Sequence, residues 1–65
     1  MKVITAVNKY LKTDREIFLQ SINDIGIYVV PKDEDFVQRF GTVVANTNVK
    51  KVDENESPDA VTIYI

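Results

Sequence analysis

Cysteine and histidine are both absent from this chain of 65 residues, and their absence limits what can stabilise its fold. A domain of this size buries only about 60% of the surface that its unfolded chain exposes, so its apolar core is thin. Small domains usually compensate with disulfides, with a structural metal or by association. Without cysteine no disulfide or thiolate metal site can form, and without histidine the commonest metal ligand is missing. The sequence therefore favours association with another chain.

The apolar residues favour a sheet. The chain contains ten valines and seven isoleucines, and β-branched side chains pack well on the pleated surface of a strand. The apolar fraction of 45% and the charged fraction of 28% are typical of a folded globular domain. We therefore expect residues 1–65 to form a single α+β domain, with an antiparallel sheet of about three strands packed on one face by two or three helices.

The segment from Thr13 to Gly26 carries the clearest local signal. In the run TDRE that begins at Thr13, the threonine hydroxyl can accept a hydrogen bond from the Glu16 amide while the Glu16 side chain reaches back, which is the capping box that opens a helix. Gly26 is the residue type that commonly ends one. The sequence therefore predicts a helix over 14–25. Its apolar arc spans roughly 200°, where about 100° suffices for one neighbour, so we expect it to be covered on two sides.

Two shorter elements follow this segment. The apolar run from Ile27 to Val30 ends at Pro31, which cannot donate to a ladder, and its β-branched and aromatic content predicts a buried strand. The acidic residues at 33–35 favour the start of a helix, because the helix dipole is positive there. We expect that second helix over 32–40, with Gly41 as its stop.

The ends of the chain complete the expected topology. Segments 42–52 and 60–65 flank the polar run DENESPD and predict a hairpin in which Val52 opposes Ala60. By the two-residue period of a strand, one face carries Val61, Ile63 and Ile65, and the other carries Thr62 and Tyr64. For residues 2–12 a stripe at 3.6-residue spacing favours a helix, although strand propensity leaves a strand as the alternative. The expected order of elements is α-α-β-α-β-β.

No pattern in the sequence indicates catalysis. There is no glycine-rich phosphate loop, nucleophile motif or metal-ligand spacing, and both glycines have a role in ending helices. The acidic run 53–59 lacks the glycine and closing glutamate of a calcium loop and indicates a solvated turn. The sequence therefore predicts a protein that is not an enzyme, with no catalytic residue, no cofactor, no metal site and no small-molecule substrate.

The start of the chain and its residue usage bear on location and origin. Residues 1–11 lack the features of a signal peptide, and no segment approaches the length of a membrane span. We therefore expect a cytoplasmic protein without a membrane partner. Frequent isoleucine, lysine, asparagine and aspartate indicate an AT-rich genome, as in some bacteria and phages.

The leading functional hypothesis is a protein-interaction or regulatory module that binds a protein partner and forms a homodimer. The wide apolar arc of 14–25 calls for a second neighbour, and the last strand, 61–65, has no charged residue to protect it if it lies at a sheet edge. The alternative is that the N-terminal segment covers that arc and that the last strand lies centrally. The candidate interface residues are Ile17, Leu19, Tyr28, Val61, Ile63, Tyr64 and Ile65.

Two other functions are weaker alternatives. The expected order from residue 14 to 65 resembles the winged-helix outline of nucleic-acid-binding regulators, with Arg39, Lys50 and Lys51 as the residues that would contact phosphate. That family places two helices between its first two strands, whereas here there is room for one, and the net charge of −2 disfavours nucleic acid. The acidic segments 33–35 and 53–59 also permit a small inhibitor that occupies a basic groove on a larger protein.

Overall fold

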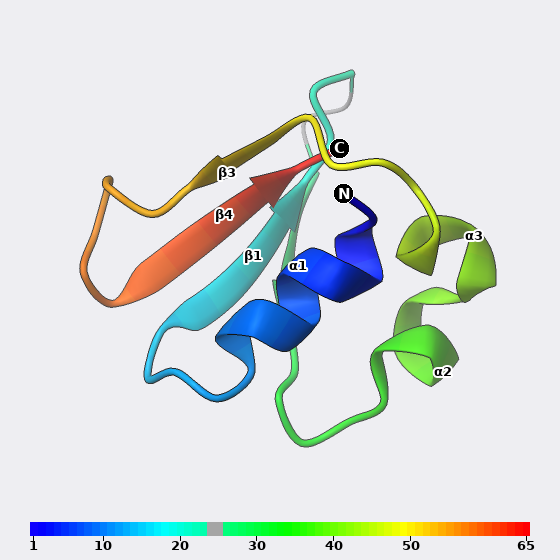
Figure 1. Cartoon of the computed structure of the whole chain (residues 1–65), viewed down its shortest axis with the longest axis horizontal. Coiled ribbons are helices and arrows are strands. Elements are labelled where there is room, and N and C mark those ends of the chain that lie inside the picture. Colours follow the sequence, from blue (N-terminus) through cyan, green and yellow to red (C-terminus); the bar gives the residue numbers. More distant parts are fainter. Residues whose placement is uncertain (24–25) are drawn as a thin grey trace.

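The protein combines three helices with one four-stranded mixed sheet, in a computed structural model that describes residues 1–23 and 26–65 (Figure 1). The sheet has the strand order β2-β1-β4-β3. β1 pairs antiparallel with β2 and parallel with β4, and β4 pairs antiparallel with β3. The elements are α1 (Val3–Tyr10), β1 (Glu16–Gln20), β2 (Ile27–Val30), α2 (Phe36–Phe40), α3 (Thr42–Ala45), β3 (Lys51–Asp53) and β4 (Ala60–Tyr64).

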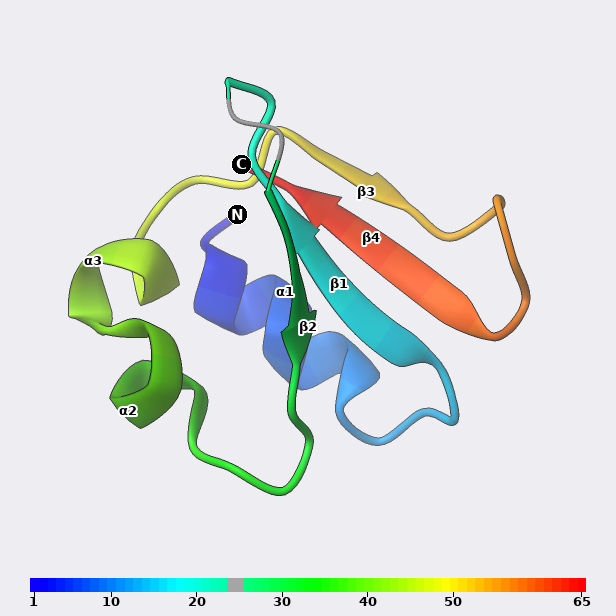
Figure 2. The same cartoon turned by 180° about the vertical axis from the view of Figure 1, so that it is seen from behind.

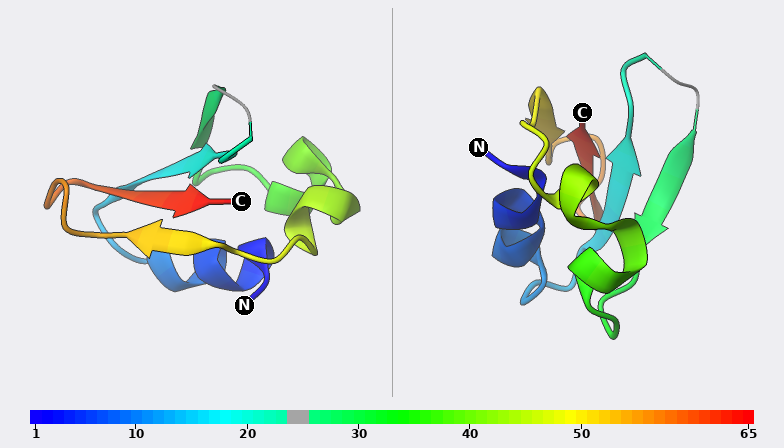
Figure 3. Two further views of the ribbon diagram at one scale, coloured as in Figure 1. Left: turned by 90° about the horizontal axis from the view of Figure 1, so that it is seen from above. Right: turned by 90° about the vertical axis from the view of Figure 1, so that its right-hand side faces the viewer.

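The core lies between α1 and one face of the sheet. Figure 2 shows the sheet in front with α1 behind it, and Figure 3 shows α1 against one face while the opposite face carries no helix. α1 forms where the 3.6-residue stripe predicted a helix, and its apolar side is buried against the sheet. α2 and α3 lie beside one end of the strands. The buried apolar residues are Val3, Ala6, Val7, Tyr10, Ile17, Leu19, Val30, Phe36, Ala45, Val61 and Ile63.

The helix predicted over 14–25 is wrong, because residues 16–20 form β1 at the centre of the sheet. Ile17 and Leu19 point into the core at 0% and 2% exposure, which is the two-residue period of a strand. The Glu16 amide donates to the Asp59 carbonyl at 2.8 Å and makes no capping box with Thr13. The apolar arc was wide because both faces of this strand carry apolar side chains. Residues 24–25 of that prediction lie outside the described residues.

Thr13 instead closes the turn between α1 and β1. Its hydroxyl donates to the Tyr10 carbonyl at 2.7 Å and accepts from the Arg15 amide at 3.2 Å. Because the chain enters the sheet here, the winged-helix outline, which begins with a helix over 14–25, does not form. The expected order is replaced by α-β-β-α-α-β-β, and the sheet is mixed instead of antiparallel.

For the next two elements, the predicted type of secondary structure is right but the predicted burial or bounds differ from the structure. β2 occupies the predicted residues, but three of its four side chains are exposed, so it is not a buried strand. α2 begins only at Phe36, because the Asp35 carboxylate caps it by accepting from the Gln38 amide at 3.2 Å. Gly41 ends α2 as predicted, with a φ of +90° that favours glycine.

The segment 42–52 is only partly a strand. The Gly41 carbonyl accepts from the Ala45 amide at 3.2 Å, which opens a new helical turn, α3, in place of the strand expected there. Only residues 51–53 form β3. Val52 pairs with Ile63 and not with Ala60, so the predicted register is wrong. The predicted faces of β4 are confirmed, since Val61 and Ile63 are buried while Thr62 and Tyr64 face the other side.

A single arginine organises the acidic turn between β3 and β4. The Nη1 atom of Arg15 donates to the carbonyls of Glu54, Ser57 and Ala60, at 2.7, 3.4 and 3.0 Å. The guanidinium therefore binds the main chain of the turn from the start of β1, two strands away from β3. This places the turn beside β1 and helps to set the register of β4.

Replacing Arg15 with alanine should destabilise the fold. Hydrogen bonds to a charged group are worth about 1.5–3 kcal/mol, and partial exposure here lowers the expected loss to about 1–2 kcal/mol. Urea unfolding followed by circular dichroism measures the change. Arg15→Lys keeps the charge but not the planar fork, so it should recover only part of the loss. An Arg15→Ala variant as stable as the wild type would show that the three contacts contribute nothing.

Candidate protein-binding surface

β2 and β3 form the two edges of the sheet, and β4 lies between β1 and β3. Of the two positions considered for the last strand, the structure shows the central one and not the exposed edge. The two edges differ in character. β3 carries Lys51 and Asp53, charged residues of the kind that protect an edge, whereas β2 reads IYVV and carries no charge. The unprotected edge of this sheet is β2.

Three consecutive side chains of β2 are exposed to solvent. Ile27, Tyr28 and Val29 are 59%, 54% and 57% exposed, while Val30 is buried at 3%. Ile27 and Val29 lie on the face that no helix covers, opposite Gln20 and Phe18 of β1. Tyr28 lies on the helix-covered face opposite Leu19, but at the rim of the domain. Strand β2 therefore presents apolar groups to solvent on both faces.

The main chain of β2 also faces outward at alternate residues. Ile65 donates to the Gln20 carbonyl at 2.9 Å and accepts from the Ile22 amide at 2.8 Å, so the even-numbered residues of β1 turn their backbone groups toward β4. Because these directions alternate along a strand, Ile17 and Leu19 turn theirs toward β2. The paired residues, Val30 and Tyr28, face β1 in return. The N–H and C=O groups of Ile27 and Val29 then point away from the sheet.

A hollow of about 610 Å³, which we call the edge hollow, borders β2 near α2 and α3. Its wall is mostly apolar and includes all three exposed residues of the strand. Gly26 leaves room for the tyrosine ring beside it, since a Cβ atom there would lie 3.1 Å from the Tyr28 hydroxyl. The residues lining the edge hollow are Leu19, Ser21, Ile27, Tyr28, Val29, Arg39, Phe40, Val44 and Ile65.

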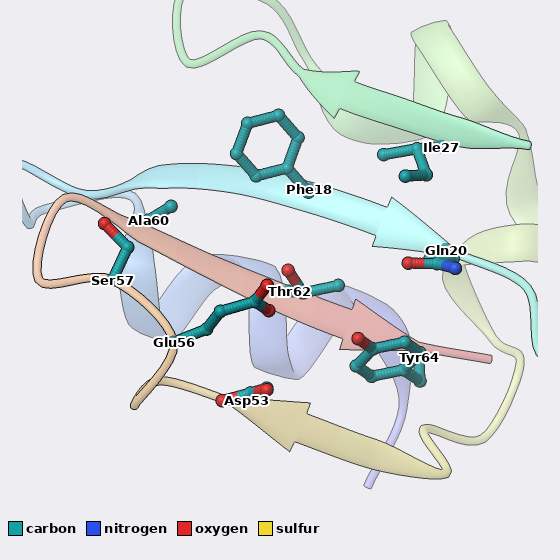
Figure 4. A pocket seen from close by; sticks show the side chains of 9 residues that line it. All are labelled: Phe18, Gln20, Ile27, Asp53, Glu56, Ser57, Ala60, Thr62 and Tyr64. Carbon is teal, nitrogen blue, oxygen red and sulfur yellow. The ribbon is translucent and has the colours of Figure 1, made fainter.

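A second hollow, of about 460 Å³, lies on the open face of the sheet (Figure 4). Phe18 and Tyr64 rise from the central strands, and Ile27 closes the side toward β2. The Nζ atom of Lys51 lies 5.7 Å from the centroid of the Tyr64 ring. The polar residues on the opposite side include Asp53 and Glu56. The open face is therefore apolar next to β2 and polar next to β3.

The structure separates the candidate interface residues into two groups. Ile17, Leu19, Val61 and Ile63 are buried in the core of one chain, at 2% exposure or less. Tyr28, Tyr64 and Ile65 reach the surface or line one of the two hollows. Ile27 and Val29 could not be identified from the sequence, because an apolar run has the same composition whether its strand is central or at an edge. The signal that marks them is the lack of any charge in an edge strand.

The basic residues named for nucleic-acid binding lie on separate elements. Arg39 belongs to α2 and lines a hollow together with the three acidic residues at 33–35, so carboxylates lie on the same part of the surface as its charge. Lys50 precedes β3 and Lys51 lies in it, at the sheet edge opposite β2. These three side chains do not form one basic surface.

The burial of Ile63 predicts a role in folding. Ile63→Ala should lower the free energy of unfolding by about 2–5 kcal/mol, the usual cost of truncating a buried isoleucine. Ile22→Ala is the matched control, since Ile22 is 55% exposed and should lose about 0.5 kcal/mol or less. Urea unfolding compares the two variants, and equal losses would contradict the assignment of Ile63 to the core.

Comparison with known proteins adds no relative. No family model, no curated protein and no solved structure matches the chain.

In the part of the chain that the structure describes, no helix has the length and apolar character needed to cross a membrane.

Proposed function

We propose that this protein is a small non-enzymatic protein-interaction module that associates with a second copy of itself through the edge strand β2. The observation that carries the proposal is the state of that edge. Its side chains at 27–29 are apolar and more than half exposed, and alternate residues direct backbone groups outward. Such an edge is a template for strand addition.

Pairing of two β2 edges would bury apolar side chains and form backbone hydrogen bonds that the single chain does not make. Full burial of a valine or isoleucine side chain contributes about 1.5–3 kcal/mol, so covering the exposed half of each residue contributes about 1 kcal/mol. The added backbone hydrogen bonds contribute about 1 kcal/mol each. A 65-residue chain without cysteine has few other sources of stability.

Charge permits a second copy as the partner. Two copies carry the same net charge of −2, so they repel each other weakly at long range. Because β2 carries no charged residue, pairing two β2 strands adds no repulsion between charges at close range. The acidic turn lies between β3 and β4, toward the other edge of the sheet, where it does not oppose the contact.

A charge placed on the edge should abolish association. We expect the wild type to sediment at micromolar concentration with about twice the chain mass of 7.4 kDa. Val29→Lys puts an ammonium group beside the outward backbone and should return the protein to the mass of one chain. Val43→Lys is the matched control, because Val43 is 83% exposed on α3 and outside both hollows, and it should remain a dimer.

Either of two results would contradict the proposal. One is a wild-type protein that sediments as a single chain throughout the micromolar range. The other is a dimer that Val29→Lys and Val43→Lys weaken equally, which would place the contact away from β2. Circular dichroism of both variants shows whether a change in mass reflects unfolding.

A further inference from the structure

The backbone of β2 restricts how two copies of this strand can meet. In an antiparallel pair, residues that face each other either both exchange hydrogen bonds or both do not. The outward-facing residues, Ile27 and Val29, must therefore face outward-facing residues of the second copy. Four two-fold arrangements centred on a residue of β2 meet this condition, with the axis at Ile27, Tyr28, Val29 or Val30.

Only the arrangement centred on Tyr28 pairs each outward-facing residue of β2 with an outward-facing residue of the other β2. A centre at Val29 places Ile27 opposite Pro31, and a centre at Val30 places Val29 opposite it, but proline has no N–H to donate. A centre at Ile27 places Val29 opposite a residue that precedes the strand. With the centre at Tyr28, Ile27 of each copy faces Val29 of the other, and each facing pair exchanges both of its N–H···O bonds.

The side chains favour the same centre. On the open face, each Ile27 meets a Val29, and this contact extends the apolar side of the second hollow, which Ile27 and Phe18 line. On the helix-covered face, the two Tyr28 rings form the non-hydrogen-bonded pair, in which side chains lie closest. Aromatic pairs of this kind stabilise a contact beyond the contribution of their buried area.

The edge hollow supplies contact area that the short strand lacks. Stable dimers bury about 800 Å² from each partner, and four strand residues span only about 13 Å. Tyr28 lies in the wall of the edge hollow, so the ring of the second copy stands at its mouth near Phe40 and Val44. Arg39, which also lines this hollow, offers a cation to the incoming ring or its hydroxyl.

We infer that two copies join antiparallel through β2 about a two-fold axis at Tyr28, so that their sheets become one continuous sheet and each copy places its Tyr28 at the edge hollow of the other. This arrangement rests on the proposed self-association and specifies its geometry.

Cysteine cross-linking tests the register directly, because the natural chain contains no cysteine. In the proposed arrangement the Cα atoms of the two Tyr28 residues lie about 4.5 Å apart, within the span of a disulfide. Tyr28→Cys should therefore form a linked dimer under mild oxidation. Ile27→Cys alone and Val29→Cys alone should link poorly, because like residues sit diagonally at about 7–8 Å.

A mixture of Ile27→Cys and Val29→Cys should link the two variants to each other, and this arm keeps the Tyr28 ring in place. The background is Val43→Cys, an exposed thiol away from β2. Pairing holds thiols at about millimolar effective concentration, so the linking arms should give at least about tenfold more disulfide than this background at micromolar protein. Non-reducing gels with reduced samples alongside measure the yield, and circular dichroism confirms folding.

The outcomes separate this inference from the proposed function. If the wild type sediments as a dimer but Tyr28→Cys and the mixed pair link no better than Val43→Cys, the register is wrong while self-association stands. Strong linking by Ile27→Cys alone or by Val29→Cys alone would place the axis at that residue and also overturn it. A wild-type protein that sediments as a single chain would contradict both the proposed self-association and this register.

Discussion

The parallel pairing of β1 with β4 is the contact on which the rest of the structure depends. It places Ile17 opposite Val61 and Leu19 opposite Ile63, and these four side chains form the buried floor beneath α1. A chain of this size has room for only one such floor. α1 covers it, α2 and α3 close one end of it, and the two outer strands attach to its sides. Every other element is placed by its relation to this pair.

Covering one face of the sheet leaves the other face and one edge without a neighbour in the same chain. α1 lies on one face of the sheet and α2 and α3 lie at one end of it. The side chains of Phe18, Ile27 and Val29 are on the face that no helix covers. At the β3 edge, charged residues provide the usual protection. At the β2 edge there is none, and this asymmetry is the physical basis for the proposed association. The same short core that stabilises the monomer thus leaves the surface through which a second copy would bind.

The candidate surface was only partly predictable because burial in a sheet depends on strand order. Tyr28 was identified from its aromatic ring on a strand, and the structure places it at the rim of the domain. Ile27 and Val29 were expected to be buried, since an apolar run bounded by Gly26 and Pro31 has the same pattern in a central strand. Conversely, Val61 and Ile63 were considered for an exposed edge, but β4 lies between two neighbours. No local pattern distinguishes these positions.

Local sequence determined the features whose energies are local: the 3.6-residue stripe of α1, the β-branched runs of β2 and β4, the alternating faces of β4, and the stop at Gly41. Tertiary structure decided the rest, and residues 13–20 show why. A helix cap contributes about 1 kcal/mol, whereas burying Ile17 and Leu19 in a central strand contributes about 1.5–3 kcal/mol for each side chain. Burial of the two side chains in the sheet therefore stabilises this segment more than a helix cap would, so the capping box does not form and the segment becomes β1. Strand order follows from that choice, and strand order alone left β2 at the edge, because long-range pairing depends on which segments share a core and not on the residues within any one of them.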